Sequence, residues 1–166
     1  MSLTLAAVGA VAAALLQSTI VPYLDIGGAR PDLVLIYAVI VTVVVGTDHG
    51  LAAALFGGII IDALAPRPFG STVFVLLVAI GGAAVIARLP ARGRAFSTVL
   101  AVLLMSLLGP LVFSVVYGAL RGPLAVANPL GSIVPDALYA TAIAALAGPA
   151  AVHAHTRFFE KERIDW

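Results

Sequence analysis

The chain has 166 residues, of which 62% are hydrophobic and 10% charged, and its mean hydropathy is +1.15. A soluble domain carries roughly 25% charged residues, so this composition excludes an ordinary water-soluble protein. The net charge of +1 offers no electrostatic attraction to nucleic acid, and the lack of cysteine excludes disulfides and thiol chemistry. We therefore expect a single transmembrane domain, 1–166, without a separate globular domain.

Six apolar segments follow one another along the chain. Lipid-exposed backbone has no water to bond, and these segments do not alternate with a period of two, so they predict helices rather than barrel strands. The predicted fold class is an all-α integral membrane protein with a six-helix bundle. The first segment lacks the basic start and the cleavage site of a signal peptide and is taken as a span. The expected helices are 2–20, 31–46, 50–64, 71–87, 96–120 and 135–153, followed by a tail at 154–166.

Prolines and glycines mark the expected ends and kinks of these helices. Pro22 and the turn-forming residues 25–28 end the first helix, because proline lacks the backbone donor that a helix interior needs. A tight turn at 46–50 separates the second helix from the third. Pro110 and Pro149 lie inside the last two helices, where we expect kinks.

The segments 31–46 and 50–64 are shorter than the roughly 20 apolar residues that cross a ~30 Å core, so they either span or form a re-entrant pair. In both cases the two termini share one side of the membrane. By the positive-inside rule that side is cytoplasmic, because it carries more basic residues. It holds Arg88, Arg92, Arg94, Arg157, Lys161 and Arg163, against Arg30, Arg67 and Arg121 on the opposite, outer side.

Small residues recur every four positions on two of the expected helices. Helices in lipid associate through close backbone approach at such residues, so both rows predict contact faces, either within the bundle or toward a partner protein. The third helix carries Gly46, Gly50, Ala54 and Gly58, which lead to Asp62, and the first carries Ala6, Ala10, Ala14 and Ser18.

A few polar residues are expected to form a buried cluster toward the outer side. They are Gln17, Asp32, Asp62, Arg67 and Asp136. Asp62 lies about 20 Å from the inner turn, at 1.5 Å per residue, and a mid-membrane carboxylate costs ~2.5–3.5 kcal/mol. It therefore needs a partner, either Arg67 or Arg30 in a structural ion pair, or a ligand, an ion or another protein. Asp32 and Asp136 each follow a proline at a helix start, where capping explains them and an internal repeat is the alternative.

The polar and titratable residues of the chain do not predict a catalytic site. The three histidines are expected at the cytoplasmic ends, far from the deeper polar groups, so no Ser–His pair forms. His153 and His155 point to opposite sides of a helix and cannot chelate one metal ion. Asp62 lacks the sequence context of an intramembrane aspartyl protease. We expect no catalytic residue, no cofactor and no metal.

The tail at 154–166 is basic and aromatic, which is typical of a segment that anchors at the membrane surface or docks to a partner protein.

Three short motifs follow one another along the first four expected helices. They are Leu16-Gln17-Ser18-Thr19, then Pro31-Asp32-Leu33, then Gly46, Gly50, Gly57 and Gly58 leading to Asp62 and Gly70. The chain resembles MreD, the rod-shape-determining membrane protein family, in the order of these motifs, in its length and in its number of spans. The resemblance covers essentially the whole chain. The resemblance implies a non-catalytic subunit of the bacterial elongation complex in the inner membrane. Such a subunit binds MreC and, with RodA, a class B penicillin-binding protein and the MreB filament, supports peptidoglycan synthesis and rod shape.

MreD is also similar in fold to the S components of energy-coupling-factor vitamin transporters. A substrate-binding transporter subunit is therefore the alternative, and the alanine row of the first helix is similar to the face by which S components dock their coupling subunit. A vitamin pocket needs several convergent polar and aromatic groups. The outer side offers mainly Gln17, Thr19, Asp32, Asp62 and Asp136, and this sparse set favours scaffolding.

Overall fold

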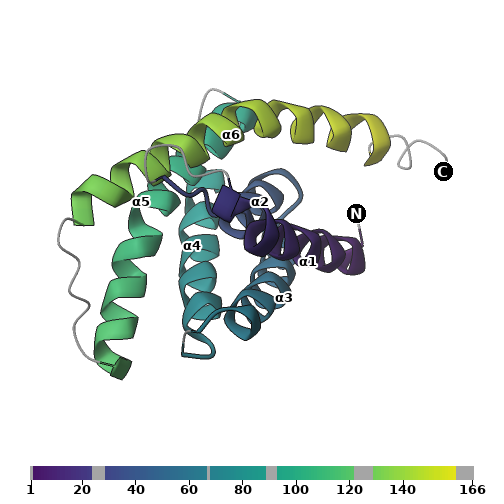
Figure 1. Ribbon diagram of the computed structural model, residues 1–166. Coiled ribbons are helices and arrows are strands. Elements are labelled where there is room, and N and C mark those ends of the chain that lie inside the picture. The colour runs from purple at the N-terminus through teal and green to yellow at the C-terminus, as the bar shows by residue number, and fades with distance from the viewer. Residues whose placement is uncertain (1, 24–28, 67, 89–92, 122–128, 160–166) are drawn as a thin grey trace.

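The computed structural model describes residues 2–23, 29–66, 68–88, 93–121 and 129–159. These residues form α1 (Leu3–Thr19), the 3-10 turn η1 (Val21–Tyr23), α2 (Leu33–Val44), α3 (Thr47–Leu64), α4 (Ser71–Arg88), α5 (Arg94–Arg121) and α6 (Pro129–Phe159) (Figure 1). Among them, α3, α4, α5 and α6 contain stretches long and apolar enough to cross a membrane. The predicted class, an all-α membrane protein, is confirmed at this level.

The shortest helix, α2, lies at the centre of the bundle. It packs against α1, α3, α4, α5 and α6. All of its 12 residues except Leu33 and Tyr37 are buried. A helix that is apolar on every side either faces lipid or is buried in a core, and the contacts around α2 show that it is buried.

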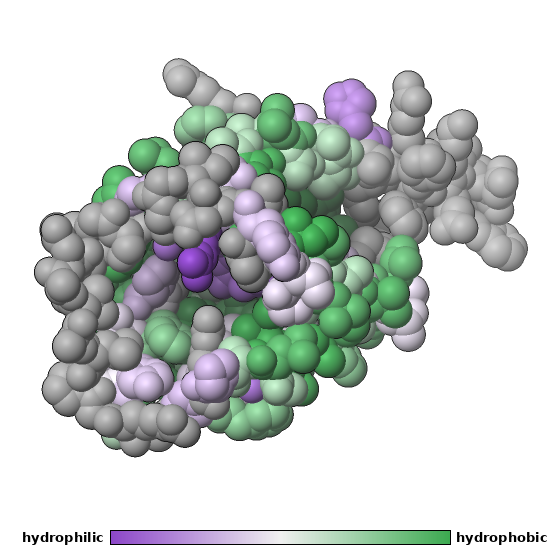
Figure 2. Space-filling view, in the orientation of Figure 1, coloured by the Kyte–Doolittle hydropathy of each residue, from purple (hydrophilic) through white to green (hydrophobic). Residues whose placement is uncertain are grey.

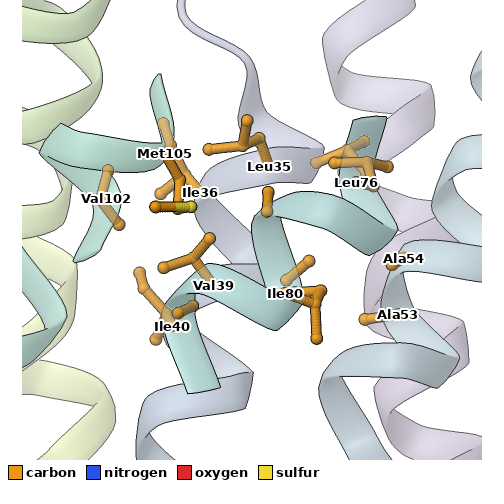
Figure 3. Packing of buried hydrophobic residues seen from close by; sticks show 14 of the residues in the cluster. Leu35, Ile36, Val39, Ile40, Ala53, Ala54, Leu76, Ile80, Val102 and Met105 are labelled. Atoms are coloured by element: carbon orange, nitrogen blue, oxygen red, sulfur yellow. The ribbon is translucent and has the colours of Figure 1, made fainter. Parts of the chain in front are cut away.

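The hydrophobic core forms around α2. Figure 3 shows Leu35, Ile36, Val39 and Ile40 of α2 between two layers of side chains. In this view, side chains of α5 lie on one side of the α2 residues, and side chains of α4 lie on the other side, followed by the alanines of α3. Alanines Ala53 and Ala54 line the α3 side, so this helix approaches α2 closely. The labelled partners from α4 and α5 are Leu76, Ile80, Val102 and Met105.

The structure corrects the boundary between the second and third helices. The predicted turn at 46–50 is shorter, because Gly46 is already the N-cap of α3 and Thr47 is its first residue. Gly46 has φ 141°, a conformation that residues with a Cβ rarely adopt. With 18 residues α3 is about 27 Å long at 1.5 Å per residue, so it is not a short helix. The two shorter apolar helices are α1, with 17 residues, and α2, with 12.

The last helix starts earlier than predicted. It begins at Pro129 rather than at residue 135, so Pro135 lies inside it and Asp136 does not belong to its first turn. Both α5 and α6 continue through their internal prolines, Pro110 and Pro149. Figure 1 shows α6 curving across one side of the bundle. The predicted turn at 25–28, Arg67 and residues 160–166 lie outside the described residues.

Candidate functional site

The small residues of α3 face other helices of the same chain. Gly50, Ala54 and Gly58 are buried. A Cβ on Gly58 would come within 2.9 Å of Val73 Cα in α4, and Gly50 lies directly against the side chain of Thr42 in α2. Gly46 does not belong to this row, because it lies outside the helix and an added Cβ would meet no heavy atom within 4 Å. The row from Gly50 to Gly58 therefore lets α3 pack between α2 and α4.

The alanine row of α1 is also covered. Ala6, Ala10 and Ala14 are each 0% exposed. The Cβ of Ala10 lies 3.4 Å from the position that a Cβ on Gly57 of α3 would take. Ser18, the last member of the predicted row, is exposed and donates a hydrogen bond to the carbonyl oxygen of Leu15, 3.0 Å away. The three alanines are thus internal contacts of the bundle and are not part of its surface.

A different face of α1 borders an open apolar groove. The groove has a volume of about 480 Å³ and lies between α1 and Phe56 of α3. Val8, one of the lining residues, is 64% exposed. The lining residues are all apolar: Ala7, Val8, Val11, Ala12, Leu15 and Phe56. We call this surface the α1/α3 groove.

Asp62 is buried near the end of α3, where its carboxylate meets the start of α4. It accepts hydrogen bonds from the backbone N–H groups of Gly70 at 2.8 Å and Thr72 at 3.1 Å. The N–H of Val73, 3.4 Å away, points to the same carboxylate. Among the described residues, the carboxylate thus caps the start of the next helix, while Arg67, one of the two expected ion-pair partners, lies outside them. The first N–H groups of a helix have no partner within it, and a carboxylate there also meets the positive end of the helix dipole.

Two side chains perform the same task at the start of α2. Asp32 is the N-cap residue and accepts a hydrogen bond from Leu35 N–H at 3.0 Å, in agreement with the predicted capping role. Gln17, which lies in α1, accepts a hydrogen bond from Val34 N–H through Oε1 at 2.9 Å. The polar end of α1 is thus joined to the first turn of the central helix.

Asp136 does not cap α6, contrary to its expected place in a first turn. Its Oδ1 accepts a hydrogen bond from the backbone N–H of Arg30, 2.7 Å away. Arg30 precedes the N-cap of α2 by two residues, so this contact attaches α6 to the segment that leads into α2. Gln17, Asp32, Asp62 and Asp136 therefore share one function: each accepts a backbone N–H at or just before a helix start. We call this end of the bundle the capped end.

A cavity of about 690 Å³ opens at the capped end. Figure 2 shows hydrophilic side chains recessed in a hollow on the viewed face. The cavity brings together Gln17, Asp32 and Asp136, whereas Asp62 is not among its lining residues. The predicted polar cluster did not include the other polar and aromatic residues of the wall, which are Arg30, Thr72, Ser106, Phe113, Ser114 and Tyr117.

One sequence signal could have found part of this wall. Ser106, Pro110, Phe113 and Tyr117 follow one another at spacings of three or four, so they share one face of α5. The rings of Phe113 and Tyr117 have centroids 5.9 Å apart. The pattern is hard to detect in the sequence because the rest of α5 is almost entirely apolar. The capped end is therefore richer in polar and aromatic groups than the sequence suggested.

No protein-family model, no curated protein and no solved structure matches the chain. The arguments for function accordingly rest on its residues and their geometry.

Proposed function

We propose that this protein is a non-catalytic scaffold subunit of the bacterial elongation complex. In this proposal it resides in the inner membrane with both termini in the cytoplasm, binds MreC, and joins RodA, a class B penicillin-binding protein and MreB in supporting peptidoglycan synthesis and rod shape. The α1/α3 groove is the observation that carries the proposal, because it is an open surface on a bundle whose small-residue rows are already occupied.

The residues behind the resemblance to MreD form one connected set of contacts. Gln17 of the first motif bonds to Val34 just after the second motif, and Asp32 of the second motif caps the same helix. Asp62 accepts a hydrogen bond from Gly70, so the last two residues of the third motif meet. These motifs hold helix ends together, which is the role expected of residues that preserve a scaffold. This agreement supports the proposal.

The groove fits a transmembrane helix of a partner. Its lining is apolar, and Ala7 and Ala12 are small enough to admit a neighbouring backbone. Association of helices in lipid depends on such close packing, since lipid chains are as apolar as the side chains themselves. We assign the groove to the membrane-spanning segment of MreC.

Co-purification with MreC from the same genome tests the assignment. Val8→Trp would fill the groove and should reduce recovery of MreC by roughly tenfold or more, as a loss of about 1.4 kcal/mol in binding would. Val85→Trp is the matched control, because Val85 on α4 is 63% exposed and Val8 is 64% exposed. Equal recovery of MreC with both variants would contradict the groove assignment. Failure of the unsubstituted chain to recover MreC at all would contradict the proposed function.

A substrate-binding subunit of a vitamin transporter is the second candidate, and the cavity at the capped end favours it. Its volume and its mixture of polar and aromatic residues are those of a small-molecule site. Genomic neighbourhood discriminates between the two candidates. A neighbouring gene for MreC supports the scaffold, whereas neighbouring genes for coupling ATPases support the transporter.

A further inference from the structure

Two hydroxyl groups at the cavity have no role in capping the helices. Thr72 of α4 and Ser106 of α5 both line the cavity, and they are 6% and 7% exposed. Within the described part of the chain, neither Thr72 Oγ1 nor Ser106 Oγ has a hydrogen-bond partner. Buried hydroxyls in folded proteins nearly always have a hydrogen-bond partner. These two unpaired hydroxyls come from neighbouring helices and line one cavity, so we infer that their partner comes from outside the chain.

The charged residues of the wall are engaged in the fold. Asp32 accepts a hydrogen bond from Leu35 N–H, and Asp136 accepts one from Arg30 N–H. A charged ligand would have to give up its water shell here, and the wall offers it charges of both signs, Arg30 beside Asp32 and Asp136, rather than a counter-charge of one sign. The unpaired groups are hydroxyls, each of which can donate one hydrogen bond and accept others. Their natural complement is an uncharged group that also donates and accepts, namely a hydroxyl or a primary amide.

The remaining wall suits an apolar body. Leu35 of α2, Val75 of α4 and Ile133 of α6 contribute aliphatic surface, and the Phe113 and Tyr117 rings contribute aromatic surface. A volume of about 690 Å³ lies within the range of roughly 300–1,000 Å³ typical of small-molecule sites.

We propose that the cavity at the capped end binds an uncharged small molecule that carries a hydroxyl or primary amide group on an apolar body. Thr72 and Ser106 hold the polar group, and the aliphatic and aromatic wall holds the remainder. Such a group can belong to the head of a neutral lipid or to a water-soluble compound. The site is separate from the α1/α3 groove, so the failure of either assignment leaves the other intact.

The absence of cysteine allows a direct test by thiol labelling. Ser106→Cys introduces one thiol at the cavity, and Ser18→Cys introduces one on the exposed end of α1 as the control. The probes are iodoacetamide, itself an uncharged primary amide, and two charged methanethiosulfonates, the sulfonatoethyl and trimethylammonioethyl reagents. For each probe, the rate at Ser106→Cys is divided by the rate at Ser18→Cys in the purified protein.

We expect this ratio to be about tenfold higher for iodoacetamide than for either charged probe, because only the uncharged amide enters without losing ionic hydration. A ratio that is equal or higher for a charged probe would overturn the proposed ligand class. No reaction at Ser106→Cys in the folded protein, with full reaction after unfolding, would show a closed void and overturn the site.

Protection against labelling tests binding itself and distinguishes the two sources. A monoacylglycerol supplied in lipid nanodiscs represents the neutral lipid, and benzamide represents the soluble amide. Protection of Ser106→Cys by either probe supports the proposal and identifies the source, whereas protection by neither overturns it.

Thr72→Val then separates binding from folding. It removes the unpaired hydroxyl but keeps the backbone N–H that bonds to Asp62, so thermal stability should stay unchanged or rise. Protection by the effective probe should fall at least about threefold, the effect of one hydrogen bond. Unchanged protection in this variant would overturn the role assigned to Thr72.

Discussion

Removing the Asp62 carboxylate should destabilise the bundle by unpairing the start of α4. Asp62 is 4% exposed, and it is the acceptor for Gly70 N–H at 2.8 Å and Thr72 N–H at 3.1 Å. The Thr72 bond is buried and the Gly70 bond is partly buried, so water reaches neither amide freely after truncation.

The size of the effect follows from these two bonds. A hydrogen bond to a charged acceptor contributes about 1.5–3 kcal/mol, and a cap contributes about 0.5–2 kcal/mol. Because the two N–H groups share one carboxylate, their contributions overlap, and we expect Asp62→Ala to lower the free energy of unfolding by about 2–4 kcal/mol. Asp62→Asn keeps one carbonyl oxygen and should lose about half as much.

The assay is reversible unfolding in mixed micelles, followed by far-ultraviolet circular dichroism. Asp48→Ala is the control, since Asp48 is an exposed carboxylate in the first turn of α3. Its loss should change the free energy of unfolding by at most about 1 kcal/mol, the contribution of a charge at a helix end. If Asp62→Ala is no more destabilising than Asp48→Ala, the capping role of Asp62 is wrong.

Three further predictions concern the packing and the other acceptors, and all are measured in the same unfolding assay. Gly58→Ala should lower stability by about 1–3 kcal/mol, because its Cβ would come within 2.9 Å of Val73 Cα. Gly81→Ala is its control, with nothing within 4 Å of the added Cβ, and should be neutral or stabilising by up to about 1 kcal/mol; equal losses would argue against close packing at Gly58. Gln17→Leu should cost about 0.5–1.5 kcal/mol by removing the acceptor of Val34 N–H, and a neutral result would show that this bond is dispensable. Asp136→Ala should have an effect of similar size, about 0.5–1.5 kcal/mol, through loss of the Arg30 N–H bond; a neutral result would show that apolar contacts alone attach α6.

Helix positions were predictable to within a few residues where prolines and glycines interrupt the apolar runs. The start of α4 at Ser71 and the end of α3 at Leu64 agree with the expected residues. The start of α6 was misplaced, because Pro135 looks like a helix start but is tolerated within the helix in the structure. The start of α3 was misplaced because Gly46 alone suffices for the turn.

Partners of the polar residues were harder to predict. The carboxylate of Asp62 suggested a cation, since charge is the most visible feature of a sequence. Its partners among the described residues are backbone N–H groups, which every residue except proline carries and which no residue type marks. The same reason conceals the contacts of Gln17 and Asp136.

The sequence by itself determined that this protein is a helical membrane protein, because 62% hydrophobic residues in long runs can satisfy their backbone in lipid only as helices. It also determined which faces carry small residues, since a period of four places them on one side of a helix. Only the tertiary structure decided that the alanines of α1 are covered, that the carboxylates cap neighbouring helices, and that α4 and α5 bring Thr72 and Ser106 to one cavity. These features join residues far apart in the chain, and their positions depend on how the helices pack against α2.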